Sequence, residues 1–215
     1  MWQFKFLTIA YLCPILLLLF FSCNTGDKKK KETAKAISNS KQKIKIVIDI
    51  QPFNDIEDEY VNYVFEHIKN VYPSVQLRKK ISLPITAFYN PRNRYRADSL
   101  IKYLKKRTIK NHITIGLTSK DISTTKGIHQ DWGVMGLGYC PGNACVVSTY
   151  RLSKIDLFEQ LYKVSIHELG HTQGLHHCEI KYCIMRDAEG KNIINEEKDF
   201  CPKCKKYLSD KGWNL

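Results

Sequence analysis

Residues 167–178, with the sequence HELGHTQGLHHC, restrict the fold of this chain more than any other segment. His167 and His171 are four residues apart, so on a helix both imidazoles lie on one face. Gly174 follows three residues later and can leave the helix with a positive φ at little cost. The chain can then turn and bring His177 back toward the first two histidines. The segment therefore predicts a helix that ends in a sharp turn, with three histidines around one point.

Three histidines at this spacing predict a hydrolytic zinc site, because three protein ligands leave the fourth position of the metal open for water. Bound zinc lowers the pKa of that water to about 7. Glu168 lies at the edge of the predicted site, where it can accept a proton from the water and pass it to a leaving amine. His176 is adjacent to His177, but only His177 has the spacing of a third ligand, so we predict that His176 does not bind the metal.

Four cysteines follow the third histidine in two pairs, Cys178 with Cys183 and Cys201 with Cys204. The second pair is a C-x-x-C knuckle, and four thiolates from two paired segments suit a closed, tetrahedral zinc site. Lysines around the knuckle can offset the negative charge of the thiolates. Two disulfides are the alternative, and the spacing favours zinc. A bound ion would stabilise a C-terminal segment that has little apolar content of its own.

Taken together, the string H-E-x-x-H-x-x-G-x-x-H-C, the following C-x-M and the later C-x-x-C resemble the archaemetzincin family. Tyr89–Tyr95 and Val146–Leu152 also look like segments of that family, so the resemblance extends roughly from Ile44 to the C-terminus. It implies a zinc metallopeptidase, either an aminopeptidase or an endopeptidase, in which Glu168 is the general base. It also implies that Met185 forms the Met-turn below the catalytic zinc.

The resemblance implies two Zn²⁺ ions per chain, one catalytic and one structural. The ligands would be His167, His171 and His177 for the catalytic zinc, and Cys178, Cys183, Cys201 and Cys204 for the structural zinc. The alternative function is a catalytically silent zinc-binding lipoprotein that acts as a binding module, and a third hypothesis is zinc buffering at the cell surface. Glu168 and the complete histidine set favour the enzyme, because a binding module is free to lose them.

Upstream of the histidines, the apolar periodicity alternates between strand and helix. We predict strands at 43–50, 74–83, 112–117, 134–137 and 145–149, and helices at 55–71, 95–107 and 155–172. This alternation predicts an α/β fold, a metzincin-like single domain in which a mixed, twisted sheet packs on helices and zinc staples the C-terminal segment. In the metzincins that the chain resembles, an edge strand above the cleft pairs with substrate, and 134–137 and 146–149 are the candidates.

The N-terminal residues differ in composition from the rest. Lys5, an apolar run over residues 7–21 and the small Ser22 precede Cys23, which resembles a bacterial lipoprotein signal peptide at 1–22 with lipidation at Cys23. The alternative is an uncleaved anchor, although the run is short for a membrane-spanning helix. Residues 23–43 are rich in lysine and lack apolar periodicity, which predicts a flexible tether. We therefore expect a membrane-anchored lipoprotein outside the cytoplasm, periplasmic or on the cell surface, with its catalytic domain at 44–215.

The formal net charge of +13 does not by itself predict a nucleic-acid partner. Eight lysines and two acidic residues within 1–43 contribute +6 of that charge, so the residues before the catalytic domain account for nearly half of it. No aromatic–basic platform or helix-turn-helix signal supports nucleic-acid binding. The expected partners are a peptide or protein substrate and the membrane, and we expect a monomer. Cys140 and Cys145 lie outside the family pattern, and either a small disulfide or two free thiols fits their loop.

Overall fold

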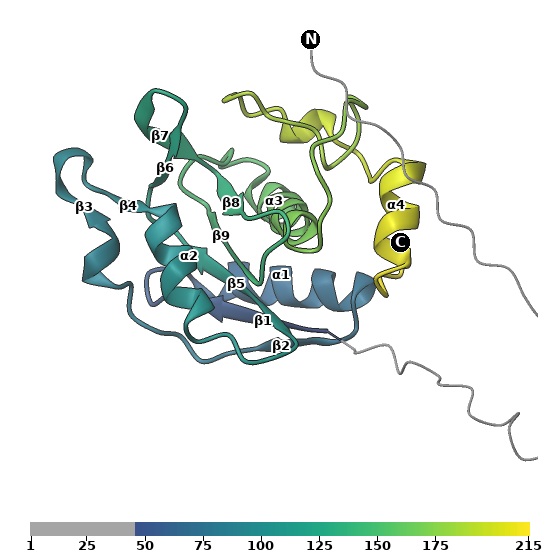
Figure 1. Ribbon diagram of the computed structural model, residues 1–215, viewed down its shortest axis with the longest axis horizontal. Helices are drawn as coiled ribbons and strands as arrows, with labels where there is room; N and C mark the ends of the chain where they lie inside the picture. Colours follow the sequence, from purple (N-terminus) through teal and green to yellow (C-terminus); the bar gives the residue numbers. More distant parts are fainter. Residues whose placement is uncertain (1–45) are drawn as a thin grey trace, which may run out of the picture. The chain divides into compact units, whose positions relative to one another are not determined.

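Two sheets and the helices around them organise residues 46–215, the part of the chain that the computed structural model describes (Figure 1). The strands are β1 Val47–Pro52, β2 Val75–Leu77, β3 Phe88–Tyr89, β4 Arg94–Arg96, β5 His112–Thr118, β6 Ile122–Lys126, β7 His129–Val134, β8 Gly136–Gly138 and β9 Ala144–Ser148. The α-helices are α1 Asp58–Val71, α2 Ala97–Lys105, α3 Leu157–Thr172 and α4 Pro202–Ser209. Single 3-10 turns lie at η1 Ile85–Ala87, η2 Asn90–Arg92 and η3 Ile194–Glu196.

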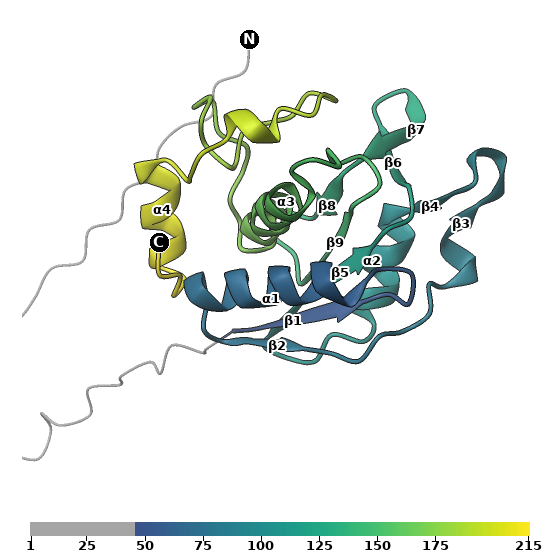
Figure 2. The same ribbon diagram turned by 180° about the vertical axis from the view of Figure 1, so that it is seen from behind.

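The larger sheet has the strand order β2-β1-β5-β9-β8, and every neighbouring pair is parallel except β8 with β9. Helices α1 and α3 cover one face of this sheet, and α2 covers the other (Figures 1 and 2). Strand β9 shows why both faces are apolar: Cys145 and Val147 join the cluster under α1 and α3, whereas Ala144 and Val146 join the cluster under α2. The predicted α/β class with a mixed sheet is confirmed.

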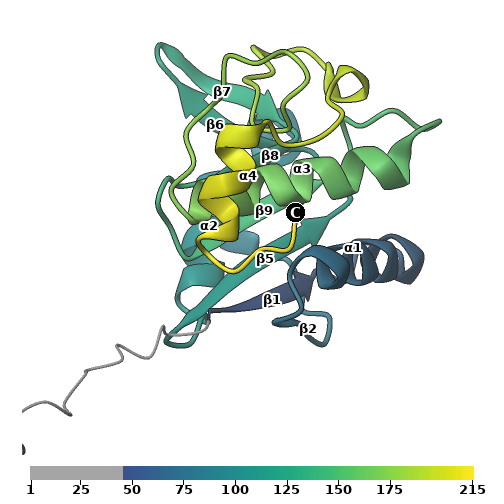
Figure 3. The same ribbon diagram turned by 90° about the vertical axis from the view of Figure 1, so that its right-hand side faces the viewer.

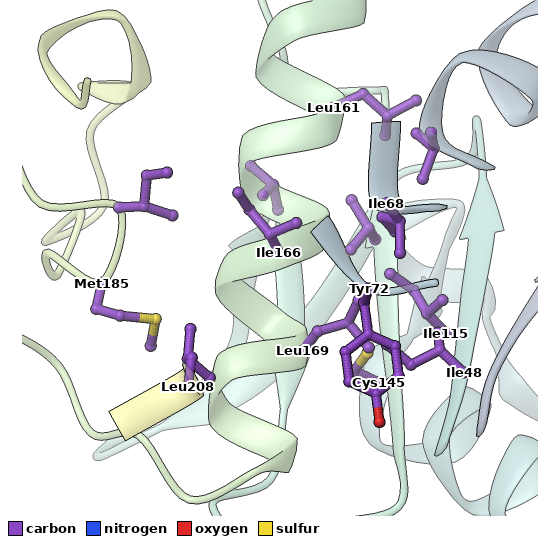
Figure 4. Packing of buried hydrophobic residues seen from close by; sticks show 14 of the residues in the cluster. Ile48, Ile68, Tyr72, Ile115, Cys145, Leu161, Ile166, Leu169, Met185 and Leu208 are labelled. Carbon is purple, nitrogen blue, oxygen red and sulfur yellow. The ribbon is translucent and has the colours of Figure 1, made fainter. Parts of the chain in front are cut away.

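The main core lies between this sheet, α1 and α3. Ile48, Ile115, Leu161 and Leu169 are fully buried there, and Leu161 and Leu169 lie on the side of α3 that faces the strands (Figure 4). Each such side chain contributes about 1.5–3 kcal/mol by leaving water. Because α3 is anchored by this packing on one side, its opposite side can be presented to a cavity without loss of the helix.

The C-terminal segment also contributes to this core, so the expectation that it has little apolar content is wrong. Phe200, Leu208 and Trp213 are each at most 2 % exposed. Helix α4 lies beside α3 (Figure 3), and the Tyr207 hydroxyl donates a hydrogen bond to the Gln173 carbonyl at 3.0 Å. The spacing of Phe200, Leu208 and Trp213 along the chain follows no single helical or strand period. A search for apolar periodicity therefore does not find them.

The helices predicted at 55–71, 95–107 and 155–172 and the strands predicted near 43–50, 112–117 and 145–149 are confirmed within a few residues. The strand predicted at 74–83 is shorter, because β2 spans only Val75–Leu77. Ile48 donates its backbone N–H to Ser74 on the β2 side at 2.8 Å. The backbone N–H groups of successive residues in a strand point alternately to the two neighbouring strands, so the N–H of residue 52 would also point toward β2. Pro52 has no N–H, and the pairing with β2 loses this hydrogen bond.

The second sheet, with the order β3-β4-β6-β7, was not predicted. The single strand predicted at 134–137 is wrong, because β7 ends at Val134 in the second sheet and β8 begins at Gly136 in the first. The sequence of β4 is Arg-Tyr-Arg, which shows no apolar alternation. Arg94 is held instead by an ion pair with Asp121 at 3.1 Å. A strand stabilised by buried charge pairs carries no signal in a search for apolar periodicity.

The edge strand next to the cavity is β8. The candidate 146–149 is wrong, because most of it lies in β9, which has β5 on one side and β8 on the other. The other candidate for this edge strand, 134–137, is correct only at residues 136 and 137, which lie in β8. In the antiparallel register with β9, the backbone groups of Gly136 and Gly138 face away from β9, toward the open edge.

The signal peptide predicted at 1–22, the lipidation site at Cys23 and the tether at 23–43 lie outside the described residues. Within residues 46–215, none of the helices has the length and apolar character needed to cross a membrane.

We predict that the sheet core, and not the exposed β6–β7 hairpin, determines stability. Ile115→Ala should lower the free energy of unfolding by about 2–5 kcal/mol, because it leaves a cavity at a fully buried position. Ile128→Ala, at a residue that is 92 % exposed, should change the free energy of unfolding by less than about 0.5 kcal/mol. Urea unfolding followed by circular dichroism measures both, and equal losses would contradict the assignment of the core.

Candidate active site

Helix α3 carries three of the predicted site residues on the side that faces away from the sheet. His167, Glu168 and His171 line one cavity, and the helix ends after Thr172. Gly174 has φ +101°, as predicted for the turn that ends the helix. The Leu175 N–H donates to the Gly170 carbonyl at 3.0 Å, which closes this turn.

The turn brings His177, and not His176, to the other two histidines. One ring nitrogen of each of His167, His171 and His177 lies within 4.8 Å of the others. The Nε2 atoms of His167 and His171 are 3.0 Å apart. The ring centroids of His171 and His177 are 4.8 Å apart. His176 is exposed and approaches the Cys140 thiol instead, with 3.8 Å between Nδ1 and Sγ.

An oxygen atom lies behind each of the three rings. His167 Nδ1 is 2.5 Å from the Ile184 carbonyl, and His171 Nδ1 is 2.7 Å from the Leu175 carbonyl. His177 Nδ1 is 3.4 Å from the Asp187 carboxylate. Such partners fix the Nδ1–H tautomer and leave each Nε2 lone pair free for a metal. The donor set therefore fits Zn²⁺, which binds imidazole nitrogen in tetrahedral geometry.

Burial keeps His167 and His171 neutral. Burial and, to a smaller extent, the neighbouring His171 lower the pKa of His167 to about 3. Burial also lowers the pKa of His171. Neutral imidazole is the form that binds a metal, so these rings need no deprotonation near neutral pH before an ion can bind.

Glu168 is buried against the edge of β8. A Cβ atom on Gly136 would lie 2.6 Å from its Oε1, so only glycine permits this approach. Burial raises the pKa of Glu168 to about 8, although the Gly138 N–H donates to the carboxylate and lowers the pKa. A cation at the histidine cluster would favour the ionised form further. Glu168 is thus held in place by the backbone of the edge strand.

Met185 lies below the histidines. A Cβ atom on Gly170 would be 2.7 Å from Met185 Sδ, so the thioether contacts α3 between His167 and His171. Figure 4 shows the Met185 side chain between the C-terminal segment and α3. This is the place that the sequence predicts for the Met-turn.

The four cysteines after the histidines form a second cluster, with all four sulfurs within 4.8 Å of one another. Cys178 Sγ and Cys201 Sγ are 3.7 Å apart. Two thiolates at the tetrahedral corners of a zinc ion are about 3.8 Å apart, given Zn–S bonds of about 2.3 Å. Among residues 46–215, all six cysteines are free thiols, including Cys140 and Cys145, and the separation therefore fits one shared metal ion better than two disulfides.

The protonation of this cluster also fits a cation at its centre. Burial raises the pKa of Cys183 to about 11 and also raises the pKa of Cys204. Burial acts in the same direction on Cys201, but hydrogen bonds from Cys204 and the neighbouring thiols lower its pKa to about 7. Four buried thiolates repel one another, so a divalent cation is needed to stabilise them together.

The cavity in front of the histidines has a volume of about 560 Å³. Its walls are the β7–β8 segment, the exposed side of α3 and the chain between Arg186 and Glu197. Sequence reasoning missed three contributors to this site: Asp187 behind His177, the Gly138 N–H at Glu168, and the buried carboxyl of Glu197. None of the three has a fixed spacing from the histidine motif, so only the fold reveals them.

Comparisons with known proteins agree on one family. The chain matches peptidase family M54 over residues 41–210. It is 31 % identical to the archaemetzincin of Methanocaldococcus jannaschii over 77 % of this chain and 94 % of that protein. The crystal structure of the Methanopyrus kandleri archaemetzincin superimposes with a TM-score of 0.67 at 28 % identity, covering 79 % of this chain and 97 % of the other. The Archaeoglobus fulgidus archaemetzincin, crystallised with malonate, gives a TM-score of 0.65 at 26 % identity, covering 75 % and 99 %.

We predict that Asp187 strengthens metal binding through His177. Asp187→Asn should weaken the affinity of the histidine cluster for a divalent ion by about 10–100-fold, because the carboxylate no longer orients the ring and raises its basicity. The affinity is measured by titration with Co²⁺. Only thiolate-bound cobalt absorbs in the near ultraviolet, so this band separates ions bound at the cysteines from ions bound at the histidines. Asp58→Asn, at an exposed position on α1, is the control. Equal affinities in the two variants would show that Asp187 has no such role.

Proposed function

The chain belongs to peptidase family M54, the archaemetzincins, which makes it a zinc metallopeptidase, and on that premise we propose a role for each residue of its site. We propose that His167, His171 and His177 hold the catalytic zinc and that Glu168 is the general base. The observation that supports this most directly is the convergence of three ring nitrogens beside a buried carboxylate in one cavity.

Zinc, when bound, polarises the scissile carbonyl and lowers the pKa of the attacking water to about 7. Glu168 accepts a proton from that water and returns it to the departing nitrogen. The Gly138 N–H holds the carboxylate in its orientation. Glu168 is itself buried, which strengthens its interaction with the reacting atoms.

The substrate is a peptide in extended conformation. The open edge of β8 presents the N–H and carbonyl of Gly136 and the carbonyl of Gly138 beside Glu168, where a peptide can add as a further strand. Hydrogen bonds to this backbone recognise any sequence, so side-chain preference must come from the rest of the cavity. We propose activity on short peptides, as an aminopeptidase or an endopeptidase.

Cys178, Cys183, Cys201 and Cys204 would hold a second, structural zinc. All four are protein ligands, so this ion would have no open position for substrate. Its role is to fix the chain after α3, which supplies His177 and Asp187 to the cavity and packs Met185 against α3.

We also propose that the domain is tethered as a lipoprotein outside the cytoplasm. The support is the order of charged, apolar and small residues before Cys23. Cys23→Ala should abolish incorporation of labelled palmitate in a bacterial host and move the protein out of the membrane fraction. Cys140→Ala is the matched cysteine control and should leave both unchanged. Labelling of the Cys23→Ala protein would rule out this attachment site.

We predict that Glu168→Ala loses peptide hydrolysis and keeps its zinc. The value of kcat/KM should fall by about 10²–10⁴-fold, because no other group in the cavity is placed to move the proton. A quenched fluorescent peptide library measures cleavage, and atomic absorption measures bound zinc. Undiminished cleavage in the variant would contradict this mechanism. A wild-type protein that binds peptides without cleaving them would favour the binding module.

A further inference from the structure

The cavity continues past the histidines toward the N-terminal end of α3. Val164 lies one turn before Glu168, about 6 Å along the helix axis, and lines the same cavity. Ile194 and Glu197 line it as well. The Lys163 ammonium donates to the Glu197 carbonyl at 2.6 Å and approaches the Ile194 carbonyl at 3.4 Å, so these residues lie against this turn of α3.

This part of the cavity wall is anchored to the active-site helix. Gln160 Nε2 donates to Asn195 Oδ1 at 2.7 Å. The Asn192 side chain donates to Gln160 Oε1 at 2.9 Å. Because these bonds, like those of Lys163, connect the segment directly to α3, Glu197 keeps a defined position relative to the catalytic histidines.

The carboxyl of Glu197 has no partner of its own among the described residues. Glu197 is only 4 % exposed, yet no described side chain or backbone N–H donates to its carboxylate, and no cation lies within ion-pairing distance. Lys163 and Arg186 lower its pKa through space, but each forms its ion pair elsewhere, Lys163 with Glu159 at 2.7 Å and Arg186 with Glu196 at 2.7 Å. A buried carboxylate without a partner is unfavourable, and burial raises the pKa of Glu197 to about 8.

The cations at the cavity do not replace that missing partner. Arg151 is held by two hydrogen bonds to the Asp121 carboxylate. Lys126 and Lys191 are exposed, so water and salt screen their charge. A cation that entered this end of the cavity would pair with Glu197 and favour its ionised form, and burial would screen that pair less than a pair at the surface.

We propose that Glu197 makes this enzyme selective for peptides that carry lysine or arginine next to the cleaved bond. The proposal rests on the peptidase function and adds its substrate preference. A lysine stem is about 6 Å long, the distance between the turns of Val164 and Glu168. The apolar part of the stem would pack on Val164 and Ile194, and the ammonium would pair with Glu197.

The test compares lysine with norleucine, which has the same stem without the charge. Hexapeptide pools carry one or the other at a single fixed position, scanned along the peptide, and kcat/KM is measured with the zinc-loaded full-length chain. At one position next to the cut, the wild-type protein should prefer lysine by about tenfold or more. Glu197→Gln should bring that ratio close to one. Glu66→Gln, at an exposed carboxylate on α1 away from the cavity, should leave it unchanged.

Two controls separate a failure of this inference from other failures. Glu197→Gln should melt no lower than the wild-type protein at pH 7, because a neutral amide replaces a buried, unpaired carboxyl. Binding of the same pools to the Glu168→Ala protein, measured by calorimetry, gives the preference without turnover. Preference for lysine that depends on Glu197 supports the inference even when no peptide is cleaved, which would count against the peptidase alone. The inference is overturned if the wild-type protein shows no preference for lysine over norleucine, or if Glu197→Gln keeps the wild-type preference.

Discussion

Each histidine of the cluster depends on an oxygen atom behind its ring, and two of these oxygens come from chain well beyond α3. The Ile184 carbonyl orients His167, and the Asp187 carboxylate orients His177. The helix alone can place His167 and His171 on one face, but it cannot set the rotation of the rings. The segment after α3 must therefore pack back against the helix before the three Nε2 atoms can converge.

The cysteine cluster explains how that segment is held. Cys178 follows His177 directly, and its N–H donates to the Met185 carbonyl at 2.8 Å. The Ile184 N–H donates to the Asp199 carbonyl at 3.1 Å, which connects the Met-turn to the chain before Cys201. We infer that a metal at the four thiols fixes both ends of the segment that carries His177 and Met185. The two clusters would then be structurally coupled, with the closed site supporting the open one.

The parts of this site with a local spacing could be predicted from the sequence, and those that depend on contacts between distant segments could not. His167, His171 and Gly174 follow from helix geometry, and the C-x-x-C at Cys201 is recognisable by itself. The α/β class follows in the same way from strand and helix periods. Glu197 and Asp187 look like ordinary surface acids in the sequence, because the burial of Glu197 and the proximity of both residues to the cavity arise only when the segment folds onto α3. The second sheet was missed for a related reason, since Arg94 in β4 is stabilised by pairing with Asp121 rather than by apolar alternation.

The most direct test of this account is the zinc content per chain, measured by atomic absorption on protein purified without chelator or added metal. The account predicts two zinc ions in the wild-type protein and one in the His167→Ala, His171→Ala double variant. It also predicts that Cys201→Ser with Cys204→Ser removes the other ion and weakens zinc binding at the histidines, because the segment that carries His177 is released. A single zinc in the wild-type protein that survives the histidine substitutions would contradict the account, since the cysteines alone would then hold the metal.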